Sequence, residues 1–167
     1  ITPKVLRDDR GYFMENYNQK TFFDGTGLEV NFVQDNISES SYGVIRGLHA
    51  QRGEHAQAKL VSVLKGEVLD VVVDLRKDSS THGNVVTAIL NDKNKQQLFA
   101  PRGCFHGFAV LSEKVTFFYK CDNFYNKEAD YGIFYDDESL SIDWQIPLEK
   151  RILSIKDQNL PLIENLK

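Results

Sequence analysis

Polar side chains interrupt several otherwise apolar segments of the chain, and such positions are where ligand-binding or reactive groups are expected. The most informative are two histidines, His49 and His106, and two cations, Arg46 and Lys59. Five stretches of the chain show such interruptions, and three of them contain these four residues. The five are Asp9-Arg10-Gly11 with Glu15, Gly43 to Gln51, Gln57 to Leu60, Pro101 to Phe108, and Phe117 to Tyr125. If these segments are strands around a cavity, their polar side chains can point into it and form a site.

His49 and His106 can serve as metal ligands, as general bases or as hydrogen-bonded core residues, because imidazole suits all three roles. The spacing Pro101-x-Gly103-x-x-His106 is similar to the second half of the metal-binding cupin signature. The first half requires a His-x-His pair and a following Glu, but the chain reads His49-Ala50-Gln51 there. Two imidazoles are fewer ligands than a divalent metal normally takes. We therefore expect no bound metal, while the choice between base and core histidine stays open.

Cys104 and His106 lie two residues apart, so in a strand they share a face and could form a nucleophilic pair. No third residue that would orient the histidine is evident in the sequence. The two cysteines, Cys104 and Cys121, have neither CxxC spacing nor the density of a disulfide-stapled secreted domain. Because free cysteines are among the most buried residue types, we predict two buried thiols.

Lys59 is flanked by apolar residues, so its ammonium either reaches solvent at a strand edge or meets an anion inside a cavity. Arg46 presents the same choice, and together with Arg10 these cations would suit a diphosphate. Tyr119 shares a predicted strand face with Phe117, which favours a buried aromatic ring whose hydroxyl needs a partner. On its own, this tyrosine does not indicate catalysis.

The composition bounds the class of protein. The 167 residues suit one domain spanning 1–167, and 41% hydrophobic with 26% charged residues is ordinary globular usage. A net charge of −4 argues against the basic face of a non-specific nucleic-acid binder. No apolar run approaches the roughly 18 residues of a membrane span, and residues 1–10 lack the order of a signal peptide. We expect a cytoplasmic protein with no nucleic-acid or membrane partner.

Many short β-branched and aromatic runs separated by turn residues predict an all-β protein. Because so many strands need protected edges, we expect a double-sheet jelly roll, which encloses a cavity. Lys65–Gly66 is predicted as a hairpin turn, and short helices are expected at 20–24 and 157–167. The predicted strands are Val30–Ile37, Tyr42–Ala50, Ala58–Leu64, Glu67–Leu75, Val85–Leu90, Gln96–Ala100, Cys104–Leu111 and Val115–Asp122.

These stretches together resemble the dTDP-4-dehydrorhamnose 3,5-epimerase family, in order and over nearly the whole chain. The matching segments include Asp9 to Glu15, Phe32 to Asn36, Val44 to His49, Gln57 to Val61, Gly66 to Arg76, Pro101 to Gly103, His106 to Phe108, Phe118 to Lys120 and Ile142 to Trp144. The resemblance implies a cupin-type jelly roll that acts without a cofactor on a dTDP-4-keto-6-deoxyhexose, and a homodimer.

The resemblance also implies roles for individual residues. His49 matches the family's general base, Asp157 its carboxylate partner, and Tyr119 the acid on the opposite face of the sugar. Lys59 matches the cation beside the C4 oxygen. The substrate-binding positions are Arg10, Phe13, Glu15, Gln34, Asn36, Arg46, His106 and Tyr125. A ketone at C4 acidifies the hydrogens at C3 and C5, so a base, an enolate-stabilising cation and a proton donor suffice for inversion.

Two positions depart from the family pattern: Ala50 replaces the usual Tyr or Phe, and Cys104-Phe105 replaces Phe-Ala. The alternative functions are a 3-epimerase or 5-epimerase acting on one centre, a non-catalytic sugar-binding jelly roll, and a metal-dependent cupin. For the homodimer we expect a strand such as Val30–Ile37 to pair with the neighbour's sheet and so hide an edge.

Overall fold

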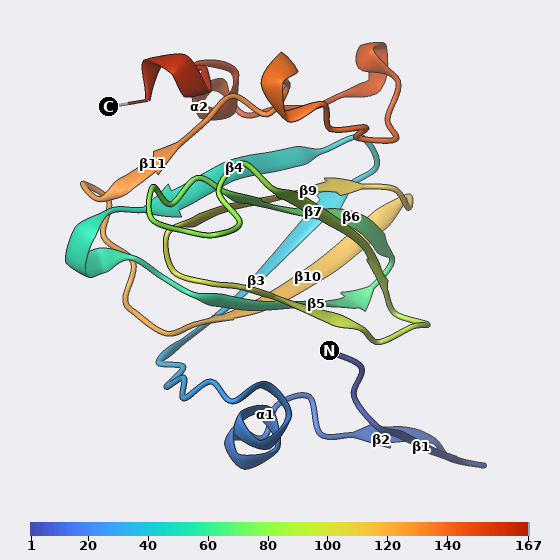
Figure 1. Ribbon diagram of the computed structural model, residues 1–167. Coiled ribbons are helices and arrows are strands. Elements are labelled where there is room, and N and C mark those ends of the chain that lie inside the picture. The colour runs from blue at the N-terminus through green and yellow to red at the C-terminus, as the bar shows by residue number, and fades with distance from the viewer. Residues whose placement is uncertain (167) are drawn as a thin grey trace.

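The protein is built from two antiparallel β-sheets that face each other, with short helices near both ends of the chain (Figure 1). The computed structural model describes residues 1–166. One sheet has the strand order β3-β10-β5-β8, the other β11-β4-β9-β6-β7, and a two-stranded hairpin, β1-β2, stands apart. The strands are β1 (Val5–Asp8), β2 (Gly11–Met14), β3 (Gln34–Ser41), β4 (Ile45–Gln51), β5 (Lys59–Lys65), β6 (Glu67–Asp74), β7 (Val85–Asn91), β8 (Gln97–Ala100), β9 (Cys104–Val110), β10 (Lys114–Cys121) and β11 (Asp130–Gly132). The predicted all-β double-sheet jelly roll is confirmed.

Several turns carry the chain from one sheet to the other. Strand β5 belongs to the four-stranded sheet and β6 to the five-stranded sheet, so the turn at Lys65–Gly66 crosses between sheets. The predicted hairpin at this turn is therefore wrong. The connections from β7 to β8 and from β8 to β9 cross in the same way. Turn residues show where the chain reverses but not which strands pair, because both kinds of connection use the same turn chemistry.

The central strands of the five-stranded sheet, β6 and β9, are buried on both faces. Between the sheets, valines and phenylalanines from both sides form one core, which includes Val61, Val63, Val68, Phe108, Val110 and Phe117. The opposite face packs under the segment that follows β11, where Trp144 is fully buried and donates its indole N–H to the carbonyl of Tyr135 at 3.0 Å. Figure 1 shows this segment, in orange and red, lying over β4 and β9. The central strands can therefore position polar side chains rigidly.

Two predicted strands have wrong boundaries. Strand β3 runs over Gln34–Ser41 instead of the predicted Val30–Ile37, and β4 begins at Ile45 rather than at Tyr42. Polar residues fill β3, so the apolar pattern that marks a strand is missing from it. The short strands β1, β2 and β11 were not predicted. The other predicted strands agree with the structure to within one residue at each end.

The predicted helical segments lie near both ends. Helix α1 (Gln19–Thr26) contains the predicted 20–24 turn and is capped by the side chain of Asn18. The predicted single helix over 157–167 is wrong, because the chain forms α2 (Ile155–Gln158) and then a 3₁₀ turn at Ile163–Asn165. Pro161 separates them, since it lacks an N–H and restricts the residue before it. Position 167 lies outside the described residues. Within 1–166, no helix has the length and apolar character to cross a membrane.

Asp74, at the end of β6, organises the loop to β7, and its removal is expected to destabilise the protein. Its carboxylate accepts hydrogen bonds from Arg76 Nη2 at 2.7 Å, Ser79 Oγ at 2.6 Å and Thr81 Oγ1 at 2.7 Å. The hydrogen bonds from the Arg76 side chain are the main cause that holds the pKa of Asp74 well below its usual range, against the effect of burial. We expect Asp74→Asn to lower the free energy of unfolding by about 2 kcal/mol at pH 7.

The same carboxylate gives this effect a pH dependence. Because the folded-state pKa of Asp74 is lowered, its contribution is complete above the unfolded carboxyl pKa of about 4 and is lost as the pH falls below it. Urea unfolding of wild type and Asp74→Asn at pH 7 and near pH 3 should therefore show a smaller difference in acid. An equal difference at both pH values would contradict this assignment.

Candidate active site

A cavity of about 480 Å³ lies between the two sheets and holds most of the polar residues that the sequence predicted. His49 on β4 and His106 on β9 are opposite one another in the register of the five-stranded sheet. Lys59 on β5 and Tyr119 on β10 come from the four-stranded sheet. Two imidazoles on one wall therefore face an ammonium and a phenol on the other.

An irregularity in β4 places Arg46 and His49 in the same cavity. Residues three apart in a regular strand point to opposite faces. The pairing of β4 with β9 shifts register between Arg46 and His49, and both side chains line the cavity. Gly47 makes the shift possible: its φ is 125°, and a Cβ there would lie 2.6 Å from the Cα of Gly107. A side chain at position 47 would push these strands apart.

His49 is paired with Asp157, as the family resemblance implied. The His49 Nε2 lies 2.5 Å from Asp157 Oδ1. Ser154 caps helix α2 by accepting a hydrogen bond from the Asp157 N–H at 3.1 Å, which orients the carboxylate. Burial raises the pKa of Asp157, but the hydrogen bond and charge of His49 outweigh it and hold that pKa below its usual value. The carboxylate is therefore ionised and suited to stabilise an imidazolium.

A second histidine–carboxylate pair lies beside the first. His106 Nε2 is 3.0 Å from Asp70 Oδ2 and 3.1 Å from Oδ1, and Asp70 is fully buried. Burial raises the pKa of Asp70, while the charge of His106 opposes the rise. Asp70 was not predicted as a site residue, although a carboxylate inside the valine-rich run of β6 is a signal that could have found it. This contact also means that His106 does not pair with Cys104.

Lys59 and Tyr119 lie in buried surroundings, which favour the uncharged form of each side chain. Burial lowers the pKa of Lys59, and nearby acidic groups, Asp130 among them, oppose this. Burial raises the pKa of Tyr119, so its phenol keeps its proton at neutral pH. Negative charge on a bound ligand would restore the stability that the Lys59 ammonium loses on leaving water.

A second cavity, of about 360 Å³, adjoins the first and shares His49, Lys59, Tyr119 and Lys156 with it. Its wall includes three of the predicted substrate-binding residues, Gln34, Asn36 and Tyr125. Gln34 accepts a hydrogen bond from the Tyr125 backbone N–H at 3.1 Å and donates to Asn36 Oδ1 at 3.0 Å. These contacts join β3 to the loop after β10, so the amide groups are held in place.

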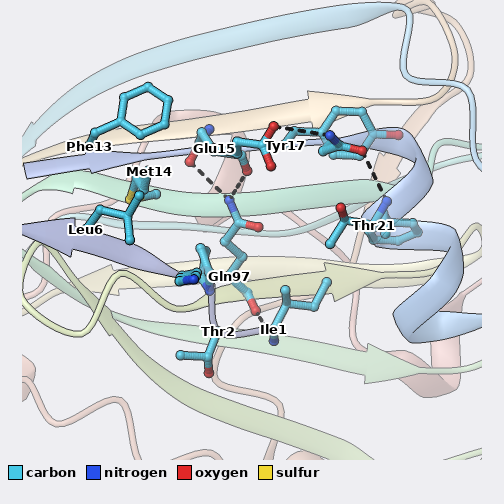
Figure 2. Close-up of a pocket in the computed structure, with 14 residues that line it drawn as sticks. Ile1, Thr2, Leu6, Phe13, Met14, Glu15, Tyr17, Thr21 and Gln97 are labelled. Atoms are coloured by element: carbon cyan, nitrogen blue, oxygen red, sulfur yellow. Dashed lines mark hydrogen bonds between the residues drawn. The ribbon is translucent and has the colours of Figure 1, made fainter.

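The structure does not bring Arg10, Phe13 and Glu15 to this cavity within one chain. They belong to the arm, which we define as the β1–β2 hairpin with Glu15. Arg10 pairs with Asp8, and Phe13 is 66% exposed. Figure 2 shows a separate cavity of about 420 Å³ beside the arm, with Phe13 lying well apart from Gln97. The arm is tied to its own chain, because Lys95 Nζ donates to the Tyr12 hydroxyl at 3.0 Å.

Neither cysteine forms part of a nucleophilic pair. Cys104 and Cys121 are both buried free thiols, as predicted. Burial raises the pKa of Cys104, and burial also raises the pKa of Cys121 to about 11. Both therefore remain protonated at neutral pH. Across residues 1–166, the His, Cys, Asp and Glu side chains form no group of three that could hold a metal ion.

Comparison with known proteins decides the family. The family model described as dTDP-4-dehydrorhamnose 3,5-epimerase matches residues 1–165. The chain belongs to this family. It is therefore an epimerase, as the sequence predicted. A curated dTDP-4-dehydrorhamnose 3,5-epimerase from Shigella flexneri is 50% identical over 157 residues, covering 94% of this chain and 86% of the relative.

Solved structures of dTDP-4-dehydrorhamnose 3,5-epimerases share the fold. The enzyme from Elizabethkingia anophelis superposes with a TM-score of 0.94 at 57% identity, covering 98% of this chain and 90% of that one. A Legionella pneumophila 3,5-epimerase in complex with dTDP-4-keto-L-rhamnose has a TM-score of 0.95 at 44% identity, covering 99% and 87%. The cupin-type jelly roll expected from the resemblance is thereby confirmed.

The two departures from the pattern of dTDP-4-dehydrorhamnose 3,5-epimerases lie in and beside the five-stranded sheet, and one of them, Ala50, also lines the second cavity. Ala50 and Phe105 belong to the same core, on the face that packs under the C-terminal segment. Ala50 is the register partner of Tyr131, and the Phe105 ring meets the Tyr131 ring edge-on at 5.0 Å. Ala50 also lines the second cavity, so a small side chain there leaves that cavity wider than an aromatic ring would. Neither change removes His49, Lys59 or Tyr119 from the first cavity.

Proposed function

We propose that this epimerase inverts both C3 and C5 of dTDP-4-dehydro-6-deoxy-D-glucose to give dTDP-4-dehydro-L-rhamnose. The observation that carries the proposal is that His49, paired with Asp157 of helix α2, and Tyr119 lie on opposite sheets across one cavity. A base and an acid on opposite faces of a sugar can remove a proton from one side and return it to the other. The complex of the Legionella relative with dTDP-4-keto-L-rhamnose supports this substrate.

His49 acts as the general base in this proposal. Its Nε2 is held by Asp157, which leaves Nδ1 to take the proton from the carbon next to the ketone. Asp157 fixes the tautomer and stabilises the imidazolium as it forms. A neutral imidazole is therefore regenerated when the proton is lost to solvent.

Lys59 stabilises the enolate. Removing the proton moves an electron pair from the C–H bond into the C=C bond and places negative charge on the C4 oxygen. A fixed ammonium in a cavity with little water lowers the energy of that charge more than it would in water. Its unfavourable burial in the free protein is then offset in the transition state.

Tyr119 delivers a proton to the opposite face and so inverts the centre. Its phenol lines the cavity and keeps its proton, because burial raises its pKa. Two such cycles, one at C3 and one at C5, complete the reaction. In each cycle His49 passes one carbon-bound proton to solvent, and Tyr119 gives one proton to carbon and regains one from solvent, so the chemistry balances without a redox cofactor.

The nucleotide part of the substrate binds at the second cavity, and its diphosphate binds at Arg46, which lines the first cavity. Arg46 is exposed and donates to Ser40 Oγ at 3.1 Å, and no carboxylate pairs with it within residues 1–166. Its guanidinium suits the diphosphate. Gln34, Asn36 and Tyr125 offer amide groups and an aromatic ring to the thymine base of the nucleotide. His106 lines the first cavity, which holds the sugar. Since a nucleotide diphosphate is too charged to cross a membrane, this assignment implies a cytoplasmic site of action.

The arm supplies the remaining contacts in a homodimer. Arg10, Phe13 and Glu15 match substrate-binding positions but lie outside their own chain's cavity. The arm exposes Leu6 and Phe13, and the edge strand β3 leaves one side unpaired within the described residues. We propose that each arm reaches the partner's cavity, which hides this apolar surface and completes the site.

A subunit-mixing experiment tests the shared site. Phe13→Ala and His49→Ala homodimers should both be inactive or nearly so. After mixing under exchange conditions, a heterodimer has one intact site, because the His49 of one chain meets the Phe13 of the other. Activity should therefore rise well above that of either variant. Two variants that do not complement, or a monomeric mass by light scattering, would contradict the shared site.

The proposed reaction itself is tested by identifying the product. Incubation of the protein with dTDP-4-dehydro-6-deoxy-D-glucose should give a product whose proton couplings, measured by NMR, show inversion at both C3 and C5. Inversion at one carbon would identify a 3-epimerase or a 5-epimerase. Bound sugar nucleotide without any inversion would identify a binding protein.

A further inference from the structure

The ammonium of Lys59 depends on the backbone of β5 for its position. Within residues 1–166, its Nζ forms no hydrogen bond or ion pair that would hold it. Lys59 is also the first residue of β5, and the ends of a strand open more readily than its centre. Whatever fixes the start of this strand therefore fixes the cation.

The two neighbours of β5 end level with Lys59. Lys59 is opposite Cys121, the last residue of β10, on one side and opposite Ala100, the last residue of β8, on the other. The segment before Lys59 therefore has no further strand to pair with. Asp122 follows the end of β10, and Arg102 lies two residues after the end of β8.

Asp122 extends the β10–β5 pairing by one residue. Its Oδ1 accepts a hydrogen bond from the Ala58 N–H at 2.7 Å, and its own N–H donates to the Ala58 carbonyl at 3.2 Å. Ala58 is only 3% exposed, so its N–H has little water to bond if the carboxylate is removed. One aspartate thus holds both backbone polar groups of the residue that precedes Lys59.

Arg102 and Asp122 form a strap across the end of β5. Arg102 Nε donates to Asp122 Oδ2 at 2.7 Å, and Arg102 Nη2 donates to the Asp122 carbonyl at 3.3 Å. Because β5 lies between β10 and β8 in the sheet, a side chain that joins the ends of these two neighbours passes the end of β5. The Arg102 side chain is 51% exposed, so the ion pair adds little to global stability. Its place beside Lys59 indicates a local role instead.

We propose that Asp122 is a positioning residue that holds Lys59 in place for enolate stabilisation, with Arg102 orienting its carboxylate. The inference rests on the proposed function, because that function assigns the enolate charge to Lys59. Asp122 lines neither the first nor the second cavity, so it acts through Ala58 and the start of β5. Without it the strand end can open, and a displacement of about 1 Å near a reaction centre can lower the rate about a hundredfold.

The test compares variants of the strap. Asp122→Ala removes its hydrogen bond to Ala58 and its ion pair, and should lower kcat by about tenfold to a hundredfold with little change in KM. Asp122→Asn and Arg102→Met each keep an oxygen that accepts from the Ala58 N–H, so they should lose only about twofold to tenfold. The matched control is Asp92→Ala. Asp92 Oδ2 accepts from the Gly66 N–H at 2.9 Å at the other end of β5, so its loss should leave kcat unchanged.

A double variant separates the positioning of Lys59 from a general structural effect. Lys59→Met should itself lower kcat, because the enolate loses its cation. Adding Asp122→Ala to Lys59→Met should cost almost nothing further, because Asp122 acts through a side chain that is already gone. The same further loss in the double variant as in Asp122→Ala alone would overturn the inference, and so would an equal loss in Asp92→Ala.

Wild-type kcat in Asp122→Ala would also overturn the inference. If Asp122→Ala does not fold, wild-type kcat in both Asp122→Asn and Arg102→Met would do the same. A raised KM at unchanged kcat would contradict it too, because the strap would then serve substrate binding. Undiminished turnover in Lys59→Met would instead refute the role that the proposed function gives to Lys59.

Discussion

Replacing His49 with alanine is expected to lower turnover, and proton exchange at C3 and C5 together with it, by about 10²–10⁴-fold. One base serves both carbons in the proposed mechanism, so its loss slows proton removal at both positions. We do not expect His106 to replace it, because the His106 side chain is only 7% exposed, whereas that of His49 is 27% exposed. Turnover is measured by NMR with the keto sugar nucleotide, and exchange by mass spectrometry in deuterium oxide.

The control for this variant is His82→Ala. His82 is exposed and contacts the Arg76 carbonyl in the loop between β6 and β7, away from both cavities, so its loss should leave turnover unchanged. Asp157→Asn should retain the fold. Its turnover should lie between that of the wild type and that of His49→Ala, since the substitution removes the charge that stabilises the imidazolium. Exchange at only one carbon in His49→Ala would mean that the two centres have different bases.

Replacing Tyr119 with phenylalanine is expected to separate exchange from inversion. The variant keeps the aromatic ring, which packs against Phe117 at a centroid distance of 6.1 Å, but it removes the proton donor on the second face. His49 still removes protons and returns them to the side from which they came. Exchange into recovered substrate should therefore persist, while inversion, at C5 above all, should fall by about 10²–10⁴-fold.

The matched control is Tyr42→Phe, because Tyr42 is a partly exposed tyrosine outside both cavities. It should invert both carbons at the wild-type rate. If Tyr119→Phe does the same, Tyr119 is only a buried aromatic residue, and the proton on the second face comes from another group or from water.

The fold was predictable where the sequence has a physical periodicity. Strands β5 to β10 are β-branched or aromatic and bounded by turn residues, and their predicted limits agree closely with the structure. Strand β3 was misplaced because its inward-facing positions are polar, as in Gln34 and Asn36, which line a cavity rather than a core. Strand pairing was not predictable, since Lys65–Gly66 has the composition of a hairpin turn but joins two sheets.

The site was predictable by residue type but not by geometry. His49, Lys59 and Tyr119 were singled out as polar groups in apolar strands, and they do meet in one cavity. The register shift that aims both Arg46 and His49 inward depends on a close approach between strands, which periodicity cannot reveal. Asp122 was overlooked because its contact with Ala58 joins residues 64 positions apart that no local pattern connects.

The deuterium content of the product formed by the wild-type protein in deuterium oxide tests the central claim most directly. The central claim is that protons leave and return at both carbons beside the C4 ketone, through His49 on one face and Tyr119 on the other. We predict one solvent-derived deuterium at C3 and one at C5 in the inverted product, with no label in a sample lacking enzyme. Inversion at either carbon without deuterium would contradict the account, because the hydrogen would then have moved without exchanging with solvent.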